Sequence, residues 1–127
     1  MRSGKPEAMN LNHLHLKVAS VERARAFYAD FFGLTDFVWH GEMLFMRDEA
    51  GMDLALAPAV DAEPLPGWFH FGFRLADASQ VRALHDRMTA AGATIIEPLT
   101  AEEQLTYFRC ADPDGHPIEV YWEPEPA

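Results

Sequence analysis

The feature that most constrains this chain is an internal repeat with an offset of 57 positions (70 − 13). His13 and His70 each lie in a segment where apolar and polar residues alternate, which is the pattern of a β-strand with one buried face. Ser20 and Asp77 follow at the same offset, each directly before an amphipathic helical pattern, where both residue types are favoured N-caps. Because repeated sequence predicts repeated structure, the chain should form the same unit twice.

Each copy of the repeat predicts one strand, one helix and three further strands. In the first copy the strands are expected at 10–18, 36–40, 42–47 and 52–57, with a helix between Ser20 and Gly33. In the second copy they are expected at 68–75, 93–98, 105–111 and 117–122, with a helix between Asp77 and Gly92. The predicted fold class is therefore α+β, with two βαβββ modules forming a curved, barrel-like mixed sheet around a cavity and the helices outside.

The predicted boundaries follow from composition. Residues 1–9 are expected to form a flexible N-terminal arm, and residues 10–123 a single domain. Module 1 takes residues 10–57, module 2 residues 68–123, and a segment rich in proline, 58–67, links them. Residues 124–127 form a tail. Because neither module is large enough to bury its own sheet face, the two should pack as a pair.

The composition excludes several classes of partner. The 127 residues include 10 Lys and Arg against 20 Asp and Glu, a net charge of −10, which argues against binding to nucleic acid or to an anionic membrane. No apolar stretch approaches the ~18 residues of a membrane span, and no signal sequence opens the chain. A cytoplasmic protein is expected. The single cysteine, Cys110, is predicted to be an ordinary packed residue.

Strand alternation brings three metal-ligating side chains to the cavity face. His13 and His70 point to this face from equivalent strands, and Glu119 points the same way if Ile118 and Val120 pack on a helix. Two histidines and one carboxylate form the facial triad of non-haem Fe(II) oxygenases, which leaves coordination positions open. We predict one divalent metal ion on these three residues, with Fe²⁺ or Mn²⁺ favoured and Zn²⁺, Ni²⁺ or Co²⁺ also compatible.

The repeat also predicts that the site has no fourth protein ligand. Glu119 lies four residues after Gly115, and the position four residues after the equivalent Gly51 is Ala55, which cannot coordinate a metal.

His15 shares a face with His13 and is either a substrate-contacting residue or a histidine at the rim.

Two tyrosines are further candidates for a catalytic role. Tyr121 and Tyr107 either donate hydrogen bonds to a substrate or simply line its space. The remaining histidines, His40, His85 and His116, are expected to be exposed to solvent rather than to bind a metal.

Three segments resemble the vicinal oxygen chelate superfamily, which includes glyoxalase I, fosfomycin-resistance enzymes, extradiol dioxygenases and bleomycin-resistance proteins. The segments are NHLHLKVASVERARAFYADFFGL, WFHFGFRLAD and DPDGHPIEVYWE, and the resemblance extends from Asn10 to about Glu123. It implies paired βαβββ modules and metal ligands at His13, His70 and Glu119.

The resemblance also separates the activities within the superfamily. Ala55 stands where glyoxalase I would carry a glutamate, which counts against that activity. The particular arrangement of basic and tyrosine residues expected around fosfomycin is not evident near Tyr107 to Cys110, so that substrate is not expected. Bleomycin-binding members lack the metal ligands that are present here.

The expected function is extradiol-type dioxygenase chemistry on a small molecule with vicinal oxygens. The alternatives are a glyoxalase-like lyase or isomerase, and a non-catalytic drug- or metabolite-binding resistance protein. The resemblance also implies a homodimer, in which modules from one chain or from two chains form each site. The sequence leaves both arrangements open.

Overall fold

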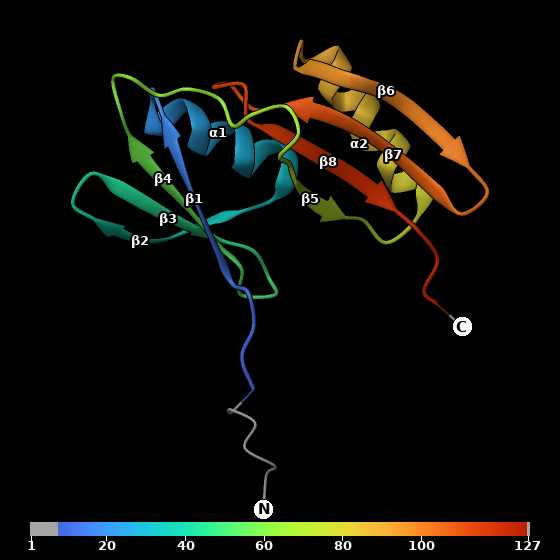
Figure 1. Cartoon of the computed structure of the whole chain (residues 1–127), viewed down its shortest axis with the longest axis horizontal. Coiled ribbons are helices and arrows are strands. Elements are labelled where there is room, and N and C mark those ends of the chain that lie inside the picture. Colours follow the sequence, from blue (N-terminus) through green and yellow to red (C-terminus); the bar gives the residue numbers. More distant parts are fainter. Residues whose placement is uncertain (1–7, 127) are drawn as a thin grey trace, which may run out of the picture.

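The computed structural model describes residues 8–126 and contains two βαβββ modules (Figure 1). Module 1 consists of β1 (His13–Val18), α1 (Val21–Phe32), β2 (Thr35–His40), β3 (Met43–Arg47) and β4 (Asp53–Pro58). Module 2 consists of β5 (Phe71–Arg74), α2 (Ala78–Ala90), β6 (Thr94–Glu102), β7 (Leu105–Ala111) and β8 (Pro117–Trp122). The predicted α+β class and the repeated unit are confirmed.

The two modules have the same sheet topology. The strand orders are β1-β4-β3-β2 and β5-β8-β7-β6, so equivalent strands occupy equivalent places. In each sheet the first and last strands of the module pair in parallel, and the other pairs are antiparallel. The eight strands therefore form two separate four-stranded sheets, which do not close into a barrel (Figure 1).

Both helices begin where their capping residues predict. The Ser20 side chain accepts a hydrogen bond from the Arg23 amide at 3.1 Å, and the Asp77 side chain accepts one from the Gln80 amide at 2.9 Å. Each bond satisfies an amide that has no partner within its helix. Gly33, at φ 68°, ends α1 in the left-handed conformation that glycine adopts without steric cost. The offset of the repeat is therefore also the offset between the two helix starts.

Several strands differ in length from the prediction, among them β1, which begins at His13 rather than at residue 10. β6 continues past Pro98, where the sequence predicted its end, because it is an edge strand and a missing amide costs it no interstrand bond. Its register with β7 shifts on both sides of Glu97. β5 is shorter than predicted and begins after His70. Residues 1–7 of the predicted arm and residue 127 of the predicted tail lie outside the described residues.

One hydrophobic core joins the modules. Buried residues of both sheets and both helices form a single cluster, and the Phe32 ring of α1 stacks on the Phe73 ring of β5 at a centroid distance of 4.0 Å. The prediction for Cys110 is confirmed, since it is a fully buried free thiol. Burial raises the pKa of this thiol to about 12, which leaves it without the thiolate needed for reactivity.

The loop between β7 and β8 fastens module 2 to module 1. Asp112 accepts a hydrogen bond from the hydroxyl of Tyr28 at 2.7 Å. His116 lies 2.8 Å through Nε2 from the carbonyl of Lys17 and accepts a bond at Nδ1 from the Leu65 amide at 3.1 Å. Since Nδ1 accepts, Nε2 carries the proton and donates it. The expectation that His116 is solvent-exposed was wrong: the ring is 1% exposed and holds the two modules together.

Substituting Tyr28 with phenylalanine should lower the free energy of unfolding by about 1.5–3 kcal/mol, because it removes a buried hydrogen bond to a charged group. Urea denaturation at pH 7 measures the change. Tyr107→Phe, at a partly exposed tyrosine, is the matched control and should change the value by less than about 0.5 kcal/mol. Equal changes in the two variants would contradict the prediction.

The burial of Tyr28 beside Asp112 makes the stability depend on pH in the alkaline range. Burial, followed by the negative charge of Asp112, holds the pKa of Tyr28 well above its ordinary 10.0. Unfolded Tyr28 therefore ionises above pH 10.0 while folded Tyr28 keeps its proton, and the wild-type protein should lose stability in this range. The Tyr28→Phe variant should lack this part of the loss.

Candidate metal centre

The polar residues of module 2 form two rows across one face of its sheet. Cross-strand partners share a face and residues two apart along a strand do so as well. The first row runs across all four strands through Gly72, Glu119, Arg109 and Glu97. The second row runs through Arg74, Tyr121, Tyr107 and Thr100. We call this surface the open face of the second sheet.

His70 and Glu119 meet at this face. His70 precedes β5 and Glu119 lies in β8, and their Nε2 and Oε2 atoms are 3.2 Å apart. Both side chains are mostly buried, with 31% and 23% of their surface exposed. The other imidazole nitrogen of His70, Nδ1, is buried and has no hydrogen-bond partner among residues 8–126. The structure therefore brings together two of the three predicted ligands.

The geometry of this pair fits a shared metal ion. Imidazole nitrogen and carboxylate oxygen bind Zn²⁺ at about 2.1 Å. Two ligands at this bond length lie about 3.0 Å from each other around an octahedral ion and about 3.4 Å around a tetrahedral one. The observed 3.2 Å falls within this range. The His70–Glu119 pair is thus compatible with two neighbouring positions of a single divalent ion.

His13 lies on the other sheet. It begins β1, is exposed, and its Nδ1 atom is 3.1 Å from the side-chain oxygen of Asn12. Its cross-strand partner in β4 is Asp53. Within the described part of the chain, no three His, Cys, Asp or Glu side chains lie close enough to hold one ion. A single chain thus presents His13 separately from the His70–Glu119 pair.

The three candidate catalytic residues are divided between the two sheets. His15 is exposed in β1, on the same face as His13, opposite Ala55. Tyr107 and Tyr121 are cross-strand partners in the second sheet, and Tyr121 shares a face with Glu119. Both tyrosines are therefore beside the candidate metal ligands, whereas His15 accompanies His13. Their catalytic roles stay predictions.

Sequence reasoning missed two residues of the open face. A Cβ atom on Gly72 would lie 3.2 Å from the Glu119 carbonyl oxygen and 3.7 Å from a ring carbon of Tyr121, so glycine permits the close approach of these strands. Arg109 lies directly between Glu119 and Glu97 in the register and forms an ion pair with Glu97 at 3.3 Å. Alternation could have assigned Arg109 to the face of Tyr107, but only the strand pairing places it beside Glu119.

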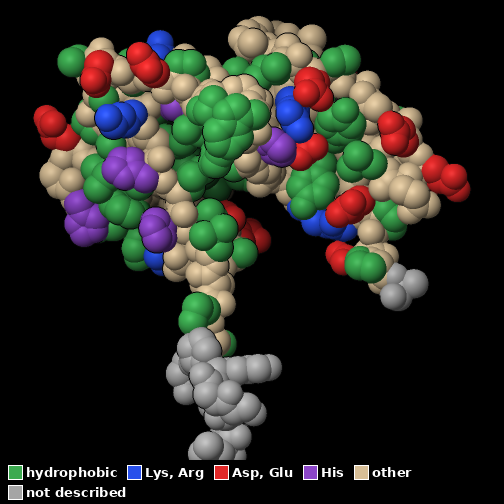
Figure 2. Space-filling model, in the orientation of Figure 1, with side chains coloured by type: hydrophobic (Ala, Val, Ile, Leu, Met, Phe, Trp, Pro, Cys, Tyr) green, Lys and Arg blue, Asp and Glu red, His purple; other side chains and the backbone are tan. Residues whose placement is uncertain are grey.

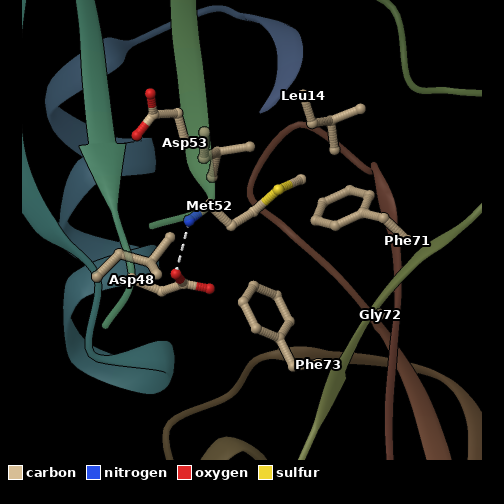
Figure 3. A pocket seen from close by; sticks show the side chains of 9 residues that line it. Leu14, Asp48, Met52, Asp53, Phe71, Gly72 and Phe73 are labelled. Carbon is tan, nitrogen blue, oxygen red and sulfur yellow. Dashed lines mark hydrogen bonds between the residues drawn. The ribbon is translucent and has the colours of Figure 1, made fainter. Parts of the chain in front are cut away.

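A small apolar pocket lies at the junction of the modules (Figure 3). It has a volume of about 100 Å³ and is lined by Leu14, Leu34, Asp48, Met52, Asp53, Leu54, Phe71, Gly72 and Phe73. Ligand pockets usually have volumes above about 300 Å³, and this one includes neither His70 nor Glu119. We therefore do not assign it to the substrate. Figure 2 shows a broader hollow between the modules, with histidine side chains gathered on the surface of module 1.

Known proteins with different activities are similar to this chain. Biphenyl-2,3-diol 1,2-dioxygenase of Sphingomonas paucimobilis is 28% identical over 121 residues, which are 91% of this chain and 39% of that protein. Metallothiol transferase FosB of Shouchella clausii is 31% identical over 118 residues, which are 87% of this chain and 78% of that protein. The chain thus spans less than half the length of the dioxygenase and most of the length of the transferase.

Solved structures and a family profile agree with this similarity. The structure of a possible glyoxalase from Bacillus cereus matches with a TM-score of 0.78 and 34% identity, covering 89% of this chain and 98% of that one. Residues 10–120 match the profile of the glyoxalase/bleomycin resistance protein/dioxygenase superfamily. The resemblance seen in the sequence motifs is confirmed, and the chain belongs to this superfamily.

Proposed function

We propose that this chain is a metal-dependent enzyme that acts on a small molecule with two adjacent oxygens, by extradiol-type dioxygenase chemistry. The observation that carries the proposal is the 3.2 Å contact between His70 and Glu119, which suits two ligands of one ion. Its location among the tyrosines of the open face supports a substrate site there. Similarity to the Sphingomonas dioxygenase favours ring cleavage as the reaction.

We further propose that His13 of a second copy completes the ligand set. His13 is exposed on the first sheet, and His70 and Glu119 lie on the second, so one chain offers both halves of a site without joining them. A two-fold dimer that places the first sheet of one copy against the second sheet of the other forms two identical sites. Each site then has two histidines and one carboxylate, which favours Fe²⁺ or Mn²⁺ over Zn²⁺, Ni²⁺ or Co²⁺ when dioxygen is the co-substrate.

The residues around this site have distinct roles in the proposal. A bound divalent ion supplies Lewis-acid chemistry, which stabilises negative charge on the two substrate oxygens. Tyr121 and Tyr107 line the substrate space from the second sheet and donate hydrogen bonds to substrate oxygens. His15 enters the same space beside His13 and accepts or returns a substrate proton.

Oxygen consumption tests the reaction. Protein purified without a histidine tag or chelators, loaded with Fe(II), is mixed with a panel of catechols that includes 2,3-dihydroxybiphenyl. We expect one O₂ consumed per ring-cleaved product, and no consumption by the Zn(II)-loaded protein, because Zn²⁺ has no redox chemistry. Absence of oxygen uptake with every catechol would rule out the dioxygenase activity.

A glyoxalase-like lyase is the second candidate, because the possible glyoxalase from Bacillus cereus is 34% identical and is covered over 98% of its length. Ala55, which cannot serve as a metal ligand, distinguishes this chain from the glyoxalase I pattern. Consumption of the hemithioacetal of methylglyoxal and glutathione by metal-loaded protein tests this reaction. Metal analysis tests the third possibility, a non-catalytic binding protein, which would contain no stoichiometric metal.

A further inference from the structure

We propose that Arg109 anchors a carboxylate of the substrate beside the metal centre, so that the substrate class is a small carboxylated diol such as a catechol carboxylic acid. The inference rests on the proposed function, since it assigns the substrate of the same site. It starts from the place of Arg109 on the open face, in β7 between Glu97 of β6 and Glu119 of β8.

The position of Arg109 puts its side chain within reach of a molecule held at the His70–Glu119 pair. Directly opposed residues of neighbouring antiparallel strands have Cβ atoms about 4.5–5.5 Å apart and point to the same side. Arg109 stands in this relation to Glu119. Its side chain is only 25% exposed, so the guanidinium is partly removed from water. A ligand group bound there would interact with a partly desolvated charge.

Arg109 has hydrogen-bond donors that the protein does not use. A guanidinium carries five N–H donors. Glu97 lies 3.3 Å from Nη1, whereas the Nε atom is buried and has no partner among residues 8–126. Buried polar groups are normally hydrogen-bonded, so an unpaired buried N–H indicates a group that completes the site.

Arg74, the other arginine of the open face, differs in this respect. Its guanidinium is paired with the carboxylates of Glu123, at 3.6 Å, and Glu125, at 3.4 Å, and it also donates to the Glu123 carbonyl. These contacts occupy it at the C-terminal end of β8. The comparison identifies Arg109 as the arginine with free donors near the candidate metal ligands.

The chemistry of a guanidinium selects the ligand. Its planar, paired donors match the two oxygens of a carboxylate, and such charge-assisted bonds are stronger than neutral ones. A molecule that presents two adjacent oxygens to the His70–Glu119 pair and a carboxylate to Arg109 satisfies both groups at once. A catechol without an acidic group satisfies only the first.

Isothermal titration calorimetry of Zn(II)-loaded protein tests the inference without any turnover. The probes are 3,4-dihydroxybenzoate and catechol, which differ by one carboxylate. The wild-type protein should bind the acid about 10-fold or more tightly than catechol, the gain expected from a charge-assisted hydrogen bond. In Arg109→Gln the two affinities should converge to within about 2-fold, with the affinity for catechol unchanged. Glu97→Gln should increase the preference for the acid, because it releases Nη1 of Arg109.

Controls separate anchoring from positioning and from failure of the proposed reaction. Arg82→Gln, at an exposed arginine of α2, should leave the preference unchanged. The zinc content of Arg109→Gln should equal that of wild type, and a loss of zinc would overturn the proposal by showing that Arg109 acts through Glu119. Equal wild-type affinities for the probes, or no binding of either, would also overturn it. A preference that depends on Arg109 would uphold the anchor even if Fe(II)-loaded protein consumes no oxygen.

Discussion

Replacing Glu119 with glutamine is expected to abolish stoichiometric binding of the divalent metal ion and all metal-dependent activity. Glutamine keeps the volume of the side chain but removes its charge and replaces one of the two carboxylate oxygens, of which Oε2 lies 3.2 Å from His70, with an amide nitrogen that does not bind the ion. Loss of groups that merely orient metal ligands already weakens binding about 10–100-fold, so loss of a ligand should weaken it by about 100-fold or more. Elemental analysis after dialysis against a defined metal buffer measures the effect.

Glu123→Gln is the matched control for this experiment. Glu123 lies four residues further along the chain, is exposed and pairs with Arg74 rather than with a histidine. This variant should retain one metal ion per site. Glu119→Gln should unfold at the same urea concentration as metal-free wild type, which shows that the loss of metal is not a loss of fold. Full metal content in Glu119→Gln would exclude this residue as a ligand.

Mixing two inactive variants is expected to restore activity, because each proposed site takes residues from two chains. His13→Ala and His70→Ala should each be inactive alone. After subunit exchange, half of the dimers contain one chain of each kind, and each such dimer has one intact site out of two. The mixture should therefore recover about a quarter of the wild-type activity and metal content.

A second pair of variants provides the control. His70→Ala mixed with Glu119→Gln should recover nothing, because both residues belong to the same module and no exchange brings intact copies together. Native mass spectrometry verifies that mixed dimers form in both cases. Mixed dimers of His13→Ala and His70→Ala without any recovery would show that the ligands do not come from two chains.

Local sequence signals predicted the fold well. The N-caps Ser20 and Asp77 and the terminator Gly33 defined the helices because capping depends on residues within one turn. Alternation assigned Glu119 and Tyr121 to one face because successive side chains of a regular strand point to opposite faces. The shared strand order of the two sheets follows from the repeat.

Contacts between distant segments could not be predicted in the same way. His116 was expected in a solvated turn, yet its ring contacts the carbonyl of Lys17, which is 99 positions away. Arg109 faces Glu119 only because β7 pairs with β8 in one particular register. The sequence predicted that His13, His70 and Glu119 face one cavity, yet within residues 8–126 of one chain His13 lies apart from the other two. Periodicity within a strand carries no information about packing between sheets.

The loop that fastens the modules leads directly into the strand that carries a metal ligand. His116 is anchored to module 1, and Glu119 follows three residues later along the chain, in β8. Module 2 transplanted alone into another protein would therefore lose the anchor that fixes where β8 begins. A chimera of this family should exchange whole chains or carry the Lys17 segment along with the β7–β8 loop. Either choice preserves the position of Glu119 relative to module 1.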